Sequence, residues 1–227
     1  MARQHLGAAA LAALVLSIGG AARAGDGDGI SSVMGSISVS AGEHRGDLAT
    51  VNGSIRIGEG AAVGRAHTVN GSVTLEPRAT ATEVKTVNGS VHLDDGAQVS
   101  GAVHTVNGSL SLARDANVTG ALANVNGAIH VNAAHVGGDV ETFNGGIEIG
   151  PNAHVDGGLT VRRNHSDHGD DIGSRNTPPR VVIGPGSVVK GPLRFERPVE
   201  LYVSDRATIG PVEGATPVRF TGDHPPG

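Results

Sequence analysis

One six-residue phrase recurs through the middle of this chain and constrains its fold more than any other feature. TVNGS followed by Ile, Val or Leu occurs four times, and NVNGAI and TFNGGI repeat it with changes. The copies follow one another too closely for a helical repeat, and they show no helical period. The asparagines of the six copies are Asn52, Asn70, Asn88, Asn107, Asn126 and Asn144.

A second period of six runs inside each repeat. Aliphatic residues begin this series at Val51, Ile57 and Val63, and it continues with one-residue slips to Val161. Six residues per side and three sides per coil predict an all-β fold. We expect a single-stranded triangular β-solenoid (β-helix) with ~18–19 residues per coil and about nine coils, rising ~4.8 Å per coil.

The hexad also predicts a register. If the aliphatic residues of the hexad point inward, the valine of each phrase lies in one internal column, and the Thr and Asn beside it point outward. The valines of this column are Val51, Val69, Val87, Val106 and Val125. Asn-Gly favours a tight turn, and stacked asparagines can hydrogen-bond along the rod as a structural amide ladder. Repetition then has a physical reason, because each coil is the apolar partner of its neighbour.

The repeats and their interruptions divide the chain. The segment 163–179 contains one aliphatic residue, Ile172, and reads as a polar loop extruded from one corner. The expected segments are a signal peptide at 1–24, a lead at 25–30, the solenoid at 31–162, the loop at 163–179, C-terminal coils and a cap at 180–222, and a tail at 223–227.

The segment 1–24 has the features of a secretory signal. A short basic start precedes an apolar run, and the small-x-small sequence ARA precedes Gly25. Cleavage there would remove two of the 17 Lys and Arg residues and no acid, leaving 15 basic against 22 acidic residues and a net charge of −7. Such a chain has no basic patch for nucleic acid. We expect a periplasmic or secreted protein of the bacterial envelope, without a transmembrane segment after cleavage.

Few residues of this chain suggest chemistry. The only local group of metal-binding side chains is His165, Asp167, His168, Asp170 and Asp171, a weak candidate for a divalent ion. The other histidines are scattered and read as solvated groups. No pair of carboxylates recurs on one strand, so we predict no catalytic residues, no enzyme activity and no cofactor. The hexads resemble those of hexapeptide-repeat acyltransferases, and the Thr-x-Asn columns resemble ice-binding arrays, but both resemblances are partial.

Longer phrases carry a closer resemblance. GAVHTVNGSLSL, VGGDVETFNGGIEIGPNAHVDGGL and IGPGSVVKGPL resemble the coils of the bactofilins, a family of polymer-forming cytoskeletal β-helix proteins. The chain is also similar to exported putative adhesins built on phrases like VNGSI. Both resemblances cover residues ~31–220, and the bactofilin resemblance implies a right-handed solenoid. The signal peptide departs from the cytoplasmic bactofilins.

Together these features predict a non-enzymatic structural or interaction protein, a scaffold or adhesin-like rod of the cell envelope. Its expected partners are a second copy of itself, as a head-to-head dimer through 33–39, or an envelope protein or polysaccharide. The alternative is a ligand- or metal-binding module that uses the 163–179 loop.

Overall fold

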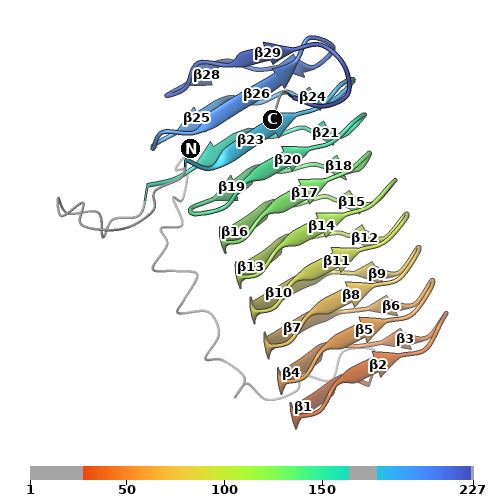
Figure 1. The fold of residues 1–227 in the computed structure, drawn as a ribbon. Coiled ribbons are helices and arrows are strands. Elements are labelled where there is room, and N and C mark those ends of the chain that lie inside the picture. Colours follow the sequence, from red (N-terminus) through yellow and green to blue (C-terminus); the bar gives the residue numbers. More distant parts are fainter. Residues whose placement is uncertain (1–27, 164–177, 226–227) are drawn as a thin grey trace, which may run out of the picture.

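The computed structural model describes residues 28–163 and 178–225, and all of its regular elements are β-strands. The strands form three parallel sheets, two of ten strands and one of nine. Each strand pairs with the third strand before it and the third after it, so the chain winds through the three sheets in turn (Figure 1). This is the expected all-β solenoid with a triangular coil, and it has about ten turns.

The three sheets are called A, B and C in the order in which the chain meets them. Sheet A contains β1 (Ile30–Met34), β4 (Leu48–Asn52), β7 (Arg65–Asn70), β10 (Glu83–Asn88), β13 (Val103–Asn107), β16 (Leu122–Asn126), β19 (Val140–Thr142), β22 (Leu159–Val161), β25 (Leu193–Phe195) and β28 (Val212–Glu213). Sheet B contains β2 (Ile37–Val39), β5 (Ile55–Ile57), β8 (Val73–Leu75), β11 (Val91–Leu93), β14 (Leu110–Leu112), β17 (Ile129–Val131), β20 (Ile147–Ile149), β23 (Arg180–Ile183), β26 (Glu200–Ser204) and β29 (Val218–Phe220). Sheet C contains β3 (His44–Arg45), β6 (Ala62–Val63), β9 (Thr80–Ala81), β12 (Gln98–Val99), β15 (Asn117–Val118), β18 (His135–Val136), β21 (His154–Val155), β24 (Val188–Val189) and β27 (Thr208–Ile209).

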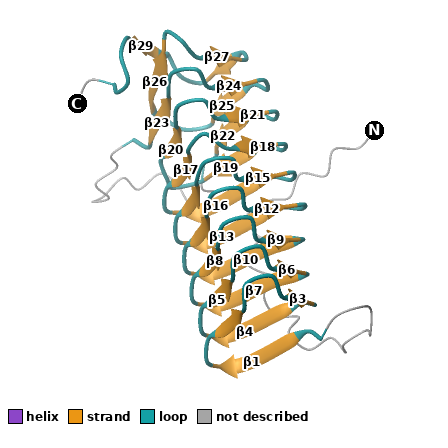
Figure 2. Cartoon of the chain, turned by 90° about the vertical axis from the view of Figure 1, so that its right-hand side faces the viewer, coloured by secondary structure: helices purple, strands orange, loops and turns teal. Residues whose placement is uncertain are grey.

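The repeats stack in register, so equivalent residues of successive coils are neighbours. Thr86 pairs with Thr68 below and with Thr105 above. The slip after Val99 lies in the corner between sheets C and A, since Val99 pairs with Ala81 before it and Val103 pairs with Val84 after it. The inserted residue therefore leaves the ladders intact, and the stack of corners stays regular (Figure 2).

The core is a column of small aliphatic side chains. Both ends of each three-residue strand in the early coils of sheet B point inward, as in Val91 and Leu93, which are 0% and 1% exposed. Sheet C contributes one inward residue per strand there, such as Val99. These residues belong to one continuous cluster along the rod. Small side chains suit this interior because three sheets close around a narrow space.

Sheet A has a register different from the one that the hexad predicts. Thr50, Thr68, Thr86, Thr105, Asn124 and Thr142 are buried, whereas Val51, Val69, Val87, Val106 and Val125 are only partly buried. The prediction of an inward valine column was wrong. Leu48 and its equivalents fill the core instead, and strict alternation along the strand then turns Thr50 inward and Val51 outward. The burial of the threonines also rules out the Thr-x-Asn surface array.

The two ends of the rod differ. At the N-terminal end, Val33 and Met34 of β1 are 69% and 80% exposed. At the other end, Phe220 of β29 is 5% exposed, and its carbonyl accepts a hydrogen bond from the Asp205 amide. No helix in the described ranges is long and apolar enough to cross a bilayer.

The corrected register is testable with two valines of the same coil. Val91→Asp buries an unpaired carboxylate, so we expect the free energy of unfolding to fall by ~3–5 kcal/mol. Val87→Asp leaves its carboxylate at the surface, and we expect a loss of ~1 kcal/mol from weaker strand propensity. Urea unfolding followed by circular dichroism measures both. Equal losses would restore the valine-inward register.

Candidate functional site

The predicted site residues form one line at the corner between sheets A and B. Each Asn side chain donates an amide hydrogen bond to the Asn one coil below, with donor–acceptor distances of 2.8–3.0 Å. At the last member, the Nη1 of Arg197 donates to the Oδ1 of Asn144 at 2.9 Å. At the other end, Met34 takes the Asn slot below Asn52. The line is thus an amide ladder with a cation at its terminal acceptor.

The buried threonines form a second line beside this ladder. Thr86 Oγ1 donates to the carbonyl oxygen of Gly71, one coil below, at 2.9 Å, and the other threonines of the TVNGS copies do the same at 2.8–3.1 Å. Asn124 replaces threonine once and donates to Gly108 and Gly127, both at 2.9 Å. These bonds satisfy polar groups that the core would otherwise leave unpaired.

The glycine of each phrase is required by close contact between coils. A Cβ on Gly89 would lie 2.0 Å from the carbonyl oxygen of Gly71, which is far inside van der Waals contact. The serine that follows adds a further bond, since the amide of Ser90 donates to the Oγ of Ser72 at 3.3 Å. Thr, Asn, Gly and Ser of the phrase therefore all hold one coil to the next.

The threonine bond can be tested by an isosteric change. Thr86→Val removes the hydroxyl and leaves the Gly71 carbonyl without this partner, so we expect the free energy of unfolding to fall by ~1–2 kcal/mol. Thr74→Val is the matched control, because Thr74 lies on the outer face of sheet B in the preceding coil. A larger loss in the control would contradict the role of the buried hydroxyl. Chemical denaturation compares the two.

The weak metal candidates His165, Asp167, His168, Asp170 and Asp171 lie outside the described residues. In the chain, the segment that holds them follows β22 of sheet A and precedes β23 of sheet B. Within 28–163 and 178–225, no group of three or more His, Asp or Glu side chains is placed to hold a metal ion.

A charged cluster on the outer face of sheet A was missed by the sequence reasoning. Lys85 pairs in register with His67 below and with His104 above, so the three side chains form one column. The Nζ of Lys85 lies 2.5 Å from Oε1 of Glu83, and the Nε2 of His67 lies 3.6 Å from its Oε2. The repeat spacing already stacks positions 67, 85 and 104 in one column, but the sequence analysis reads these histidines as solvated groups.

Burial sets the protonation of this cluster. Desolvation, reinforced by the charge of Lys85, lowers the pKa of His67 and of His104 below the ordinary histidine value. Burial opposes ionisation of Glu83, but its hydrogen bond and attraction to Lys85 outweigh this and lower its pKa. Near neutral pH the cluster therefore contains neutral imidazoles around a Lys–Glu ion pair.

These shifts predict a pH dependence of stability. A depressed pKa means that the unfolded chain binds protons more readily than the fold does. The stability from neutral His67 and His104 is fully present above ~6.5 and is lost as the pH falls from there toward their folded pKa values. We expect the double variant His67→Asn/His104→Asn to show a smaller fall in melting temperature than the parent from pH ~7 to ~5.

The control for this experiment is His92→Asn, an exposed position on sheet B. Its melting temperature should follow the parent across the same pH range. Parallel curves for the parent and the double variant would contradict the assignment.

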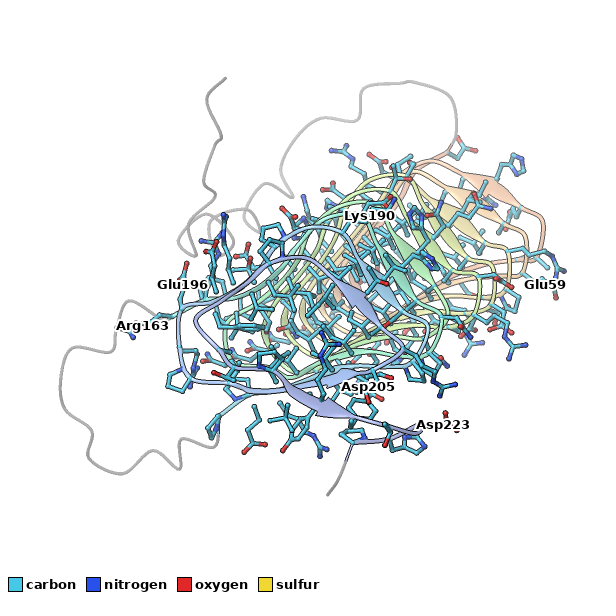
Figure 3. The ribbon with its side chains drawn as sticks, turned by 90° about the horizontal axis from the view of Figure 1, so that it is seen from above. Glu59, Arg163, Lys190, Glu196, Asp205 and Asp223 are labelled. Carbon is cyan, nitrogen blue, oxygen red and sulfur yellow. The ribbon has the colours of Figure 1, made fainter. Side chains whose placement is uncertain are left out.

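A second polar chain crosses the outer face of sheet C. His135 lies 2.9 Å from Asn117 Oδ1 through Nδ1 and 2.9 Å from Asp156 Oδ2 through Nε2, and Lys190 lies 2.6 Å from Asp156 Oδ1. The hydrogen bonds from Lys190 and then His135 lower the pKa of Asp156. Figure 3, viewed along the rod, shows Lys190 projecting outward.

Next to this chain is a shallow groove of about 190 Å³. Its polar lining consists of uncharged hydroxyls and amides, with aliphatic residues of the same strands between them. The lining residues are Val63, Thr80, Ala81, Thr82, Gln98, Val99, Ser100, Asn117 and Thr119. The arrangement offers hydrogen bonds to a polar surface.

Comparisons of the chain with protein-family models, with curated proteins and with solved structures gave no match.

Proposed function

We propose that this protein is an exported, non-enzymatic structural or interaction protein of the bacterial cell envelope, a rigid scaffold or adhesin-like rod. The observation that carries the proposal is that the polar residues of the repeated phrase connect successive coils. Its Thr, Asn, Gly and Ser each join one coil to the next. Repetition in this chain thus provides a stiff rod of regular length with three long faces.

The resemblance to bactofilins and to exported adhesins supports the same role. In both groups the solenoid serves assembly or attachment, and the signal sequence favours the exported alternative. Expected partners beyond a second copy are an envelope protein or polysaccharide. The groove and the His135–Asp156–Lys190 chain supply polar groups along sheet C for such a partner.

The export proposal has a direct test. The full chain, expressed in a bacterial host and fractionated, should appear in the periplasm or medium with Gly25 as its first residue. The intact mass of the purified protein shows whether residues 1–24 have been removed. A protein that keeps Met1 and stays in the cytoplasm would contradict it.

Cross-linking in envelope fractions followed by affinity capture then tests the scaffold role. An envelope component that is captured by the parent, and lost with His135→Ala/Lys190→Ala, would place the partner on sheet C. Capture that instead depends on residues 163–179, together with tight zinc binding by the parent, would favour the alternative, a metal- or ligand-binding module in that loop.

A further inference from the structure

The valine of the repeated phrase makes no polar side-chain bond between coils and, unlike the aliphatic residue that ends the phrase, does not lie in the core. It faces outward from sheet A in the five copies that contain it, as does Val33 one coil earlier, and each of these valines keeps part of its surface exposed. We name this column the valine stripe: Val33, Val51, Val69, Val87, Val106 and Val125. Valine suits any strand, but six outward copies in one line also form an apolar surface along the rod.

The column next to the stripe has a symmetric order. From the second coil to the sixth it reads Ala49, His67, Lys85, His104 and Ala123, and the register places these residues directly above one another. The order is the same in both directions about Lys85. A twofold interface requires such self-complementarity. If one residue of the first copy contacts a second residue of the other copy, the same contact occurs with the two copies exchanged.

We propose that the outer face of sheet A is a homodimer interface, in which two copies pack valine stripe against valine stripe about a twofold axis parallel to β10. A half-turn about this axis reverses the order of the coils in the second copy. It keeps each column of one copy opposite the same column of the other. Val87 then faces Val87 of the second copy, and Val69 faces Val106. Small Ala49 faces small Ala123, and His67 faces His104.

The charges of this face allow a second copy as the occupant. Lys85 and Glu83 form an ion pair on the central coil, so two copies bring two cations and two anions together at the axis. The axis places Lys85 opposite Lys85 and Glu83 opposite Glu83 of the second copy, and the quartet has no net charge because each Lys85 keeps its own Glu83 as partner. The flanking imidazoles are neutral near pH 7, which avoids repulsion where His67 meets His104.

The size of the face sets the expected strength. Five coils, from Val51 to Val125, at ~4.8 Å and five strand residues at ~3.3 Å give a face of ~24 Å by ~16 Å, or ~400 Å² per copy. Two copies would bury ~800 Å², which is below the range of stable specific complexes, so the dimer is a weak one and should dissociate on dilution. The proposal goes beyond the scaffold role and does not depend on where the protein resides.

Charge substitution on the stripe tests the geometry. Val69→Lys/Val106→Lys puts like charges opposite each other in both halves of the interface and should give a monomer. Val69→Lys/Val106→Glu puts opposite charges there and should restore the dimer. Thr74→Lys/Ser111→Lys, on the outer face of sheet B, is the matched control and should leave the dimer intact. Sedimentation of the full chain over a range of concentrations measures each, with circular dichroism confirming the fold.

A cross-linking experiment tests the axis without disturbing the charge. The chain contains no cysteine, so single thiols can be placed at will. Val87→Cys lies on the axis and should be linked to its counterpart by a short thiol cross-linker. Val51→Cys faces Val125 and lies about four coils, or ~19 Å, from its counterpart, so it should not be linked.

Four results would overturn the proposal. They are a parent that stays monomeric at high concentration, two stripe variants that are both folded and monomeric, linking at Val51→Cys as strong as at Val87→Cys, and a dimer that Met34→Lys alone dissociates. The last would place the contact at the N-terminal end of the rod, head to head. Protection of the stripe from hydrogen exchange at every concentration, with no dimer, would show that the chain's own residues cover it.

Discussion

The close approach of successive corners is the constraint on which the rest of this structure depends. Parallel strands fix the rise between coils, and at the Asn-Gly corner the backbones come so near that a Cβ on Gly89 would lie 2.0 Å from the oxygen of Gly71. Only glycine fits there. Once coils are this close, the Thr hydroxyl, the Asn amide and the Ser oxygen all find partners in the neighbouring coil. A change in one coil is therefore felt by the coils above and below it.

The fold could be predicted from the sequence because so short an interval between copies leaves few ways to bury aliphatic residues. The corner insertions and the inward residues of sheets B and C, such as Ile57 and Val63, also follow from the hexad. The same count failed on sheet A. Hydrophobicity alone favours Val51 over Thr50 for the interior, yet the hydrogen bond of Thr50 to the Gly35 carbonyl and the burial of Leu48 decide the register.

The surface features were also missed. The histidines at 67 and 104 read as ordinary solvated groups, although the repeat spacing already stacks them on either side of position 85. The structure brings them together because Lys85 lies between them in register. No residue count shows that burial by these neighbours lowers the pKa of both imidazoles. The arrangement of the candidate metal ligands at 165–171 could not be predicted at all. Their segment does not repeat, so it has no register from which its geometry can be derived.

The inward threonine and the outward valine of the same phrase have different roles. The polar residues of the phrase hold successive coils together. The valine adds little to that, yet it recurs with the same regularity. Phe143 takes the next slot of this column and is 6% exposed, and its carbonyl accepts a hydrogen bond from Arg197. The column is thus buried at Phe143 and partly exposed over the earlier coils. A second copy in reversed order would cover that exposed part with a surface of the same kind.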